Sequence, residues 1–466
     1  MSPRLHPYQV TGAEWLSSPN LPKRGLLWPV GLGKTLPSLQ VLDDFYSTCR
    51  ATRPLVLAPI LATSTTWPGE LRKWFPALPY RVIWQEVNDL RRRYNRARKE
   101  GMSTRTLLRE ARKTLLQFDG VTLCNYDNLR FLAQLFGKAW PYDLVIMDES
   151  DRLKNASAGR TRAAIQVGRL ADRVIELTGT FAPRSLEDCW SQAKILDDGQ
   201  RLGRSLTEFR TRWFTPHPRS FGWIQKPGAA EEVSLILADL YMSLRAEDYL
   251  DLPERIDNVL EVELPQGVRA QYAKLEREAF LELQETSIDA PNAGVLVGKL
   301  QQLASGALYL EGGGWTHLHD AKMDALDSVL GQCGGEPVLV VYGYRSELER
   351  LQVRYPSAEL LTAENGADVV TRWNAGQIPL LLSYPTDSLN LQPGGRHMVW
   401  FHPPWDLRQY VQMCGRLHRQ GQQRRTFFHH LVARGTVDED VMAALARKAR
   451  VQETLLAGVR ARVASV

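Results

Sequence analysis

Short apolar runs that end in polar or small residues recur along the chain. The clearest examples are residues 55–59, 143–148, 338–342 and 380–383. Continuous apolar strands of this length are typical of parallel sheets that are buried on both faces. Segments with a helical period lie between them, for example residues 348–351 and 410–417. The pattern predicts an α/β protein with two lobes, each a parallel sheet flanked by helices.

The middle of the chain departs from this pattern. Residues 233–283 are rich in Leu, Glu and Arg, with an expected break at Leu252-Pro253 and a glycine-rich turn at residues 312–314. We interpret this region as a crossing between lobes, followed by a helical insertion at about 265–310. The predicted lobes cover residues 1–243 and 244–466, and residues 437–466 have the pattern of a C-terminal helix.

A glycine-rich turn near the N-terminus carries the first candidate chemistry. Its residues are Gly31, Leu32, Gly33, Lys34 and Thr35. Such a turn lets backbone N–H groups surround phosphates, with Lys34 on the β- and γ-phosphates and Thr35 on Mg²⁺. The strict pattern has a small residue where this chain has Trp28. A surface turn before a helix is the alternative.

An acidic pair follows the apolar run that ends at residue 148. Asp148 is expected to hold Mg²⁺ through water, and Glu149 to orient or deprotonate the attacking water. A solvated loop is the usual interpretation of such a pair. The combination with Lys34 and Thr35 favours a site that binds ATP and Mg²⁺.

Two arginines near the C-terminus complete the candidate ATPase. Arg416 and Arg419 lie within residues 412–422 (Q-M-C-G-R-L-H-R-Q-G-Q), one helical turn apart. This is the form of an arginine finger that neutralises a transferring phosphoryl group. Gln412 is expected on the γ-phosphate side or at the lobe interface. A salt-bridged basic helix face is the alternative for the arginines.

Composition limits the function classes. The chain has 466 residues, 44% of them hydrophobic and 24% charged, with a net charge of +6 and a pI near 9.0. The length predicts two or three domains, and the mild basicity permits a polyanionic partner. The first residues have no apolar signal region, and no apolar run approaches the roughly 20 residues of a membrane span. Five cysteines without a C-x-x-C pair argue against disulfides and a zinc site.

These motifs resemble superfamily II helicases of the Swi/Snf-type ATPase group, in the compact form of phages and bacteria. The resemblance runs from about Leu5 to the mid-440s. It includes an opening Q motif around Gln9, motif III at residues 177–180, motif V at 388–391 and the H-R-x-G-Q ending of motif VI at 418–422. That ending favours this group over the DEAD-box RNA helicases.

The resemblance implies two RecA-like lobes that close over ATP and Mg²⁺, with Gln9 on the adenine. It implies motion along DNA, most often duplex DNA. We expect the process to be replication, repair or recombination, and we expect the protein to act as a monomer in the cytoplasm of a bacterial or phage-infected cell. The resemblance also implies that a helix at residues 437–466 braces the lobes; a packed terminal helix is the alternative. Candidates for coupling or nucleic-acid contact are Lys73, Thr178, Thr180, Ser383, Asn390 and Trp405.

Several residues depart from the family pattern. The acidic box reads Asp148-Glu149-Ser150-Asp151, with a carboxylate at its fourth position instead of the common histidine. Phe181 replaces a usual proline, Arg184 a frequent asparagine and Ser388 a common glycine. We expect these changes to affect the response to DNA and the coupling of hydrolysis to each step more than ATP cleavage itself.

The nucleic-acid track has weaker signals. Residues 89–113 contain ten basic side chains, which fit either phosphate contacts or a solvated helical pair. Six tryptophans are candidates for base stacking, although core packing accounts for most of them: Trp67, Trp74, Trp213, Trp223, Trp373 and Trp405. Two other functions stay open, namely a strand-separating helicase on forked DNA or RNA and a low-turnover, nucleotide-gated clamp on DNA or protein.

Overall fold

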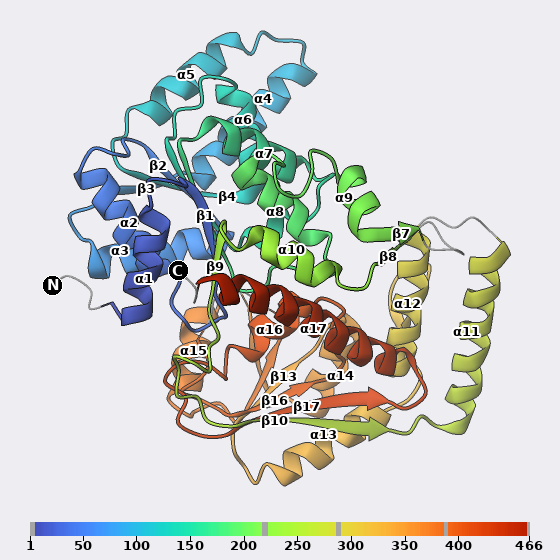
Figure 1. Ribbon diagram of the computed structural model, residues 1–466. Helices are drawn as coiled ribbons and strands as arrows, with labels where there is room; N and C mark the ends of the chain where they lie inside the picture. The colour runs from blue at the N-terminus through green and yellow to red at the C-terminus, as the bar shows by residue number, and fades with distance from the viewer. Residues whose placement is uncertain (1–4, 217–221, 286–289, 363, 386–389, 464–466) are drawn as a thin grey trace. The chain divides into compact units, whose positions relative to one another are not determined.

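The computed structural model describes residues 5–216, 222–285, 290–362, 364–385 and 390–463 (Figure 1). The chain divides into two compact units. Unit 1 comprises Met1–Leu250 and Lys448–Val466, and unit 2 comprises Asp251–Arg447.

Unit 1 is built on a parallel sheet with the strand order β3-β4-β2-β5-β6-β1-β9. The strands are β1 (Lys23–Leu27), β2 (Pro54–Ala58), β3 (Tyr80–Val82), β4 (Val121–Asn125), β5 (Leu144–Asp148), β6 (Arg173–Thr178) and β9 (Tyr241–Ser243). Strands β2, β4 and β6 are buried along their whole length, as continuous apolar runs in a doubly covered sheet require. An antiparallel hairpin, β7 (Phe214–Pro216) and β8 (Trp223–Gln225), stands apart from the sheet.

Helices connect these strands and cover the sheet. They are α1 (Pro7–Ser17), α2 (Thr35–Ser47), α3 (Trp67–Trp74), α4 (Trp84–Lys99), α5 (Arg105–Leu116), α6 (Tyr126–Phe136), α7 (Gly159–Leu170), α8 (Asp188–Asp197), α9 (Leu206–Trp213) and α10 (Ala229–Leu237), with short turns η1 (Ala62–Thr66) and η2 (Ser150–Leu153). Their apolar faces and the sheet form one continuous core.

Unit 2 repeats the design with the order β10-β17-β16-β13-β15-β14, again all parallel. Its strands are β10 (Arg255–Val262), β13 (Val338–Val341), β14 (Glu359–Leu361), β15 (Leu380–Ser383), β16 (His397–Trp400) and β17 (Thr426–Ala433), with a separate hairpin of β11 (Ala307–Tyr309) and β12 (Trp315–His317). Its helices are α11 (Gln266–Glu285), α12 (Ala290–Ala304), α13 (Ala321–Gln332), α14 (Arg345–Arg354), α15 (Gly366–Asn374), α16 (Leu407–Cys414) and the start of α17 (Val437–Val463).

The predicted fold class, two lobes with parallel sheets flanked by helices, is confirmed. The structure places the change of unit after Leu250, whereas the sequence pattern had suggested residue 243. Residues 448–466 belong to unit 1, although the pattern assigned them to the second lobe. Leu455, Leu456 and Val459 of α17 are buried in the unit 1 core, and the Ser234 hydroxyl donates a 2.7 Å hydrogen bond to the Leu455 carbonyl.

Candidate nucleotide site and nucleic-acid contacts

Strand order brings three predicted motifs to one edge of the unit 1 sheet. Strands β5, β6 and β1 are neighbours and parallel, so their carboxyl ends lie side by side. The glycine-rich loop follows β1, the acidic box follows β5, and motif III follows β6. Ligands bind outside the carboxyl ends of strands in open α/β sheets.

The glycine-rich loop has the backbone that its glycines permit. Gly31 and Gly33 have φ values of 100° and 66°, which side chains with a Cβ rarely adopt. Lys34 occupies the N-cap of α2, and its Nζ donates a 2.8 Å hydrogen bond to the Trp28 carbonyl. The N–H groups of this first turn have no partner inside their own helix, which suits phosphate binding.

Gln9 lies against this loop. Its Nε2 donates to the carbonyl oxygens of Leu32 at 3.3 Å and Gly33 at 3.4 Å, while its Oε1 accepts from the His6 N–H at 3.0 Å. Tyr8, which sequence reasoning did not select, donates to the same Leu32 carbonyl at 3.3 Å. The Q-motif helix is thus anchored to the loop, and recognition of adenine by Gln9 stays a prediction.

Trp28, the unusual first residue of the loop, is fully buried. Its ring packs on Gly12 of α1 so closely that a Cβ at Gly12 would lie 2.4 Å from Trp28 Cη2. The Tyr8 ring meets it edge-on at 5.7 Å. The large residue is accommodated because a glycine faces it, which explains how the loop tolerates this departure.

Asp148 is held by two aromatic residues. The Trp67 indole Nε1 donates to the carboxylate at 2.9 Å, and the Tyr126 hydroxyl donates to the Asp148 carbonyl at 2.7 Å. Burial, with help from the Glu149 charge, raises the pKa of Asp148 to about 6, while the Trp67 hydrogen bond and the Lys34 ammonium act in the opposite direction. Glu149 has a left-handed backbone with φ of 56°, a conformation that is uncommon outside glycine and clusters at functional sites.

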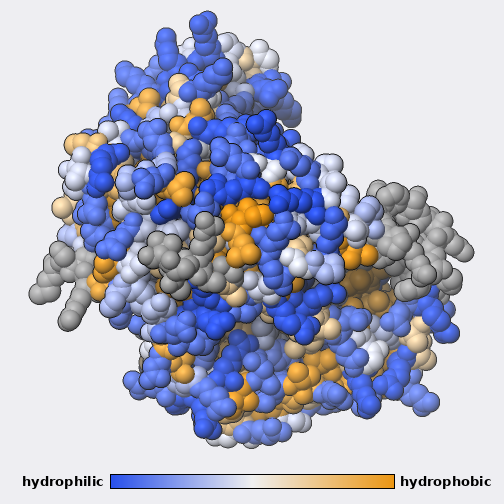
Figure 2. All heavy atoms as spheres, viewed as in Figure 1, coloured by the Kyte–Doolittle hydropathy of each residue, from blue (hydrophilic) through white to orange (hydrophobic). Residues whose placement is uncertain are grey.

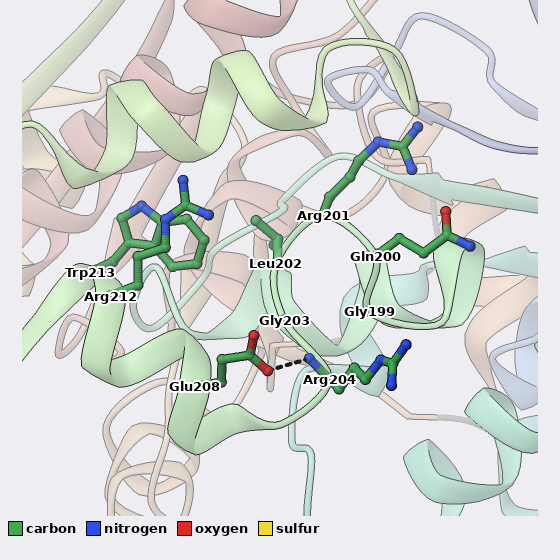
Figure 3. A pocket seen from close by; sticks show the side chains of 9 residues that line it. All are labelled: Gly199, Gln200, Arg201, Leu202, Gly203, Arg204, Glu208, Arg212 and Trp213. Carbon is green, nitrogen blue, oxygen red and sulfur yellow. Dashed lines mark hydrogen bonds between the residues drawn. The ribbon is translucent and has the colours of Figure 1, made fainter.

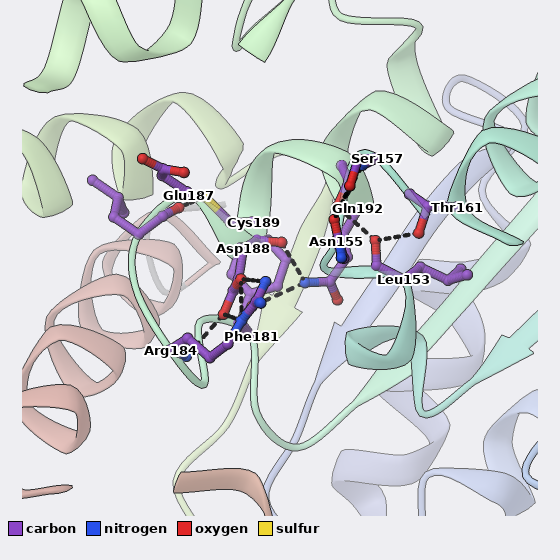
Figure 4. A network of polar contacts seen from close by, with 12 residues as sticks. Leu153, Asn155, Ser157, Thr161, Phe181, Arg184, Glu187, Asp188, Cys189 and Gln192 are labelled. Atoms are coloured by element: carbon purple, nitrogen blue, oxygen red, sulfur yellow. Dashed lines mark hydrogen bonds and ion pairs between the residues drawn. The ribbon is translucent and has the colours of Figure 1, made fainter. Parts of the chain in front are cut away.

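The unusual acidic box is connected to motif III. The Thr180 hydroxyl donates to buried Asp151 Oδ2 at 3.4 Å, so the fourth position of the box contacts motif III through a carboxylate. Gln192 on α8 makes a second link, because its Oε1 accepts from the Ser150 hydroxyl at 3.0 Å. The Nε2 of Gln192 donates to the Phe181 carbonyl at 2.9 Å (Figure 4). Sequence reasoning missed Gln192 because nothing in its local pattern marks it.

Motif III has two further contacts. Thr178 Oγ1 donates to the Thr180 carbonyl at 3.1 Å and accepts from the Thr180 N–H at 3.2 Å, and both threonines are buried. Gln452 of α17 donates from Nε2 to the Gly179 carbonyl at 3.3 Å. The C-terminal helix therefore contacts motif III within unit 1.

Arg184 precedes α8 and is held by the first residue of that helix. Its guanidinium contacts Asp188 at 2.5 Å, and its backbone N–H donates to the same carboxylate at 2.8 Å (Figure 4). The arginine at this position thus closes the turn that enters α8.

Unit 2 carries the predicted finger residues. The expected helix through residue 417 is corrected: α16 ends at Cys414, and both arginines lie in the turns after Gly415. Arg416 is buried, and burial lowers the pKa of Arg419. The Arg416 carbonyl accepts from the Leu391 N–H at 3.3 Å, which joins motif VI to motif V.

Other residues of motif VI support this turn. His418 Nδ1 lies 2.9 Å from Thr426 Oγ1, and Gln422 Nε2 donates to the Leu417 carbonyl at 3.2 Å. Gln412 on α16 is buried. These side chains stabilise the backbone that presents the arginines.

The remaining coupling candidates have diverse surroundings. Lys73 is exposed, with Nζ 4.4 Å from the Trp74 ring centroid. In unit 2, the Ser383 hydroxyl donates to the Tyr384 carbonyl at 2.8 Å, the Asn390 carbonyl accepts from Asn374 Nδ2 at 3.0 Å, and Trp405 Nε1 donates to Gln301 Oε1 at 3.1 Å. Ser388 lies outside the described residues.

The basic run at residues 89–113 forms the helices α4 and α5. Figure 2 shows a mostly hydrophilic surface over them, at the top of the view. Arg91 and Arg112 donate to main-chain carbonyls of Asp127 and Leu135. Other side chains of the run are exposed to solvent: Arg93, Arg96, Arg98, Lys99 and Arg105.

Three tryptophans considered for base stacking have no exposed ring. Trp67, Trp213 and Trp373 are buried to 1% exposure or less, so the stacking interpretation is wrong for them. Apolar burial of a ring this large outweighs its single polar N–H. Trp405, at 36% exposed, keeps a ring accessible to solvent.

A hollow in unit 1 is lined by several basic residues (Figure 3). Arg201 there is paired with Asp239 at 2.6 Å, and Arg212 with Glu232 at 2.7 Å. Glu208 accepts a 2.8 Å hydrogen bond from the Arg204 N–H. Ion pairing within the protein satisfies Arg201 and Arg212, and the hollow lies apart from the motifs described above.

A parallel sheet with a glycine-rich loop, an acidic box and motif III at one edge is the arrangement of an α/β ATPase. Comparison with known proteins is consistent with this class: residues 8–303 match the SNF2-related domain. The chain belongs to this family of Swi/Snf-type superfamily II ATPases and is therefore an ATP hydrolase that acts on DNA.

Several relatives align along nearly the whole chain. Protein p41 of Acyrthosiphon pisum secondary endosymbiont phage 1 is 37% identical, over 94% of this chain and 95% of p41. Human ZRANB3, a DNA annealing helicase and endonuclease, is 25% identical over 93% of this chain, which spans 39% of the human protein. A solved structure, the Sulfolobus solfataricus SWI2/SNF2 ATPase core in complex with dsDNA, is 19% identical, covers 99% of this chain and 94% of that chain, and has a TM-score of 0.44.

Among the residues that the structure describes, no helix is both long and apolar enough to span a membrane.

Proposed function

We propose that this protein couples ATP hydrolysis to movement along duplex DNA. The observation that carries the proposal is the convergence of the loop after β1, the acidic box after β5 and motif III after β6 at one sheet edge, with Thr180 bonded to Asp151. A nucleotide-dependent shift in the acidic box would reach motif III through that contact. Family membership supports the choice of DNA as the track.

The residues of unit 1 fit ATP and Mg²⁺ in their chemistry. Thr35 and Asp148 provide the oxygen ligands that Mg²⁺ prefers, and the Asp148 side chain is partly exposed. Backbone N–H groups from Gly31 to Thr35 would surround the phosphates, with Lys34 on the outer ones. When bound, Mg²⁺ neutralises charge on the phosphate oxygens.

The remaining roles concern water and charge. Glu149 would orient the attacking water, since its left-handed backbone turns it away from the strand direction. Arg416 and Arg419 would supply positive charge from unit 2, and Gln412 would contact the γ-phosphate side. Gln9 would exchange its present partners for the adenine edge, where an amide offers one donor and one acceptor.

The DNA contacts are proposed to be with backbone phosphates. Exposed arginines of α4 and α5 and Lys73 of α3 provide charge without a sequence-reading module. Trp405 and Asn390 are the candidates in unit 2. We place the activity in the bacterial or phage-infected cytoplasm, in replication, repair or recombination, and expect a monomer.

Steady-state ATP hydrolysis with no nucleic acid, duplex DNA, single-stranded DNA and RNA in turn tests the proposal. We expect the strongest stimulation by duplex DNA, and triplex displacement would then report translocation. Stimulation by single strands or RNA alone would favour strand separation, to be checked by strand displacement. ATP binding without turnover under every condition would favour a clamp.

Variants separate the ATP site from general damage. Lys34→Ala should abolish turnover while the circular dichroism spectrum is unchanged, and Arg416→Ala or Arg419→Ala should slow it by roughly 10³-fold. Lys138→Ala, which removes an exposed lysine outside these motifs, is the matched control and should keep normal turnover. Normal turnover in Lys34→Ala would contradict the site assignment.

A further inference from the structure

A buried cluster of metal-ligating side chains lies in unit 2, apart from every motif described above. Cys333 follows α13, His397 begins β16, and His429 lies on β17. Each of the three is only 7% exposed. One sulfur and two nitrogen atoms lie no more than 4.8 Å from one another.

The sheet pattern explains why these side chains meet. His397 and Val399 share one face of β16, and His429 and Leu431 share the same face of β17, because side chains alternate along a strand. Helix α13 packs on that face through Met323, Leu326 and Val329, which share a core with Val399 and Leu431. The end of α13 therefore places Cys333 over the two histidines.

The spacing of the donors matches a tetrahedral metal site. His397 Nδ1 and His429 Nε2 are 3.4 Å apart, and two nitrogens bound to one tetrahedral Zn²⁺ are separated by about 3.3–3.4 Å. A sulfur and a nitrogen on Zn²⁺ are about 3.6 Å apart, so a movement of about 1 Å by the Cys333 side chain closes the site.

A carboxylate lies near the second ring nitrogen of His397, an arrangement that is common for metal-bound histidines. Glu336 Oε2 lies 3.7 Å from His397 Nε2, the nitrogen that faces away from His429. Arg396 holds the same carboxylate in an ion pair, and this arginine keeps the pKa of Glu336 below its usual range. A carboxylate near the second ring nitrogen orients a metal-bound histidine and raises its basicity.

Protonation favours metal binding at the two histidines and opposes it at Cys333, because burial raises the pKa of the Cys333 thiol, which must lose its proton to bind a metal. Burial lowers the pKa of His397, and burial lowers that of His429 to about 4. Both imidazoles are therefore neutral at pH 7 and offer lone pairs. A stacked pair of neutral histidines with a hydrogen bond between their rings, beside a free thiol, is the competing interpretation, and measurement of the metal content distinguishes the two.

We propose that Cys333 Sγ, His397 Nδ1 and His429 Nε2 bind one Zn²⁺, with water as the fourth ligand. Mixed thiolate and imidazole ligands select a borderline-soft cation such as Zn²⁺ over Mg²⁺ or Ca²⁺. The ion would tie the end of α13 to the neighbouring strands β16 and β17. Its role is to stabilise unit 2, and it is independent of the proposed nucleotide site.

Metal content is the direct test. The full chain, produced without a histidine tag and purified without chelator, is titrated with Zn²⁺, desalted and analysed by inductively coupled plasma mass spectrometry. We expect one equivalent of Zn²⁺ per wild-type chain and its loss in Cys333→Ser and His429→Gln. Cys414→Ser, which alters another buried cysteine of unit 2, and His319→Gln should retain the metal.

A second measurement needs no variant that must fold. Alkylation of Cys333 in the native wild-type protein, followed by peptide mass spectrometry, should be at least about tenfold slower with Zn²⁺ than after chelation, because a metal-bound thiolate is not free to react. Co²⁺ in place of Zn²⁺ should show a sulfur-to-metal absorption band. Equal labelling with and without Zn²⁺, or equal Zn²⁺ content in Cys333→Ser and Cys414→Ser, would overturn the proposal.

Discussion

The hydrogen bond from Trp67 to Asp148 makes a specific prediction about the acid limb of ATP hydrolysis. Trp67→Phe keeps a buried ring of similar shape but removes the indole N–H that lies 2.9 Å from the carboxylate. This donor stabilises the ionised form of Asp148, which is the form that binds Mg²⁺. Its loss should therefore raise the pKa of Asp148 and weaken Mg²⁺ binding.

The size of the effect follows from the geometry. A hydrogen bond to a charged group contributes about 1.5–3 kcal/mol, and about 1.4 kcal/mol corresponds to one pKa unit. The acid limb should thus move upward by about one to two pH units. With the pKa of Asp148 at about 6 in the wild type, ionisation at pH 7 would fall from about nine-tenths to between about one-tenth and one-half.

The assay is the pH dependence of kcat/KM for ATP between about pH 5 and 9, at saturating and at limiting Mg²⁺. Trp74→Phe is the matched control, because it removes the same N–H from the same helix while its partner is Glu70, at 2.9 Å. Trp67→Phe should lose most activity near neutral pH, regain it at higher pH, and need more Mg²⁺. Trp74→Phe should follow the wild type.

Superimposable pH profiles for Trp67→Phe and the wild type would refute this reasoning. A uniform loss at every pH would also contradict it, because that result would indicate a packing defect around α3. A shift of equal size in Trp74→Phe would show that the hydrogen bond to Asp148 is not the cause.

Three further predictions concern buried groups. Gly12→Ala should lower the thermal midpoint of unfolding and weaken ATP binding, because the new Cβ would lie 2.4 Å from the Trp28 ring. Such overpacking costs about 1–3 kcal/mol. Gly69→Ala is the control, because a Cβ at Gly69 meets open space. Burial raises the pKa of Glu176 from 4.5 to about 8. The free energy of unfolding should therefore fall by roughly 5 kcal/mol as the pH rises from 4.5 to about 8, because the folded protein must then ionise a buried carboxyl group. In thermal melts at several pH values, Glu176→Gln should reduce this dependence of stability on pH. Lys322 and Asp438 form an ion pair at 2.6 Å, and both side chains are fully buried. Lys322→Met should lower the stability of unit 2 by about 3–5 kcal/mol, because it leaves the buried Asp438 carboxylate without its cation. Recovery of stability in Lys322→Met/Asp438→Leu would confirm that the unpaired charge is the cause.

Patterns along the sequence predicted an element correctly where the residues of a single segment are enough to identify it. The apolar runs predicted β2, β5, β13 and β15 because a strand buried on both faces must be apolar throughout. Strand β10 was not predicted, because it lies within the region that we interpreted as a crossing between lobes. It is at the edge of its sheet, and the charged residues Arg255, Asp257 and Glu261 interrupt the apolar run that marks the other strands.

Side-chain partners from distant elements were beyond the sequence patterns. Trp67 was considered for DNA, yet it donates to Asp148, and Gln192 had no motif to mark it. Both contacts depend on the order of strands and on how α3 and α8 pack. A sequence pattern describes neighbours along the chain, whereas these residues meet across 81 and 42 positions.

The sequence by itself determined the class of this protein, since glycine, lysine and carboxylate chemistry at strand ends is local and specific. It determined the fold class for the same reason, because periodicity is a local property. Only the tertiary structure decided that Trp28 packs on Gly12, that Asp151 reaches Thr180, and that Cys333 meets two histidines. The missing C-x-x-C pair had argued against zinc, but ligands drawn from one helix end and two strands need no such spacing, because folding brings them together.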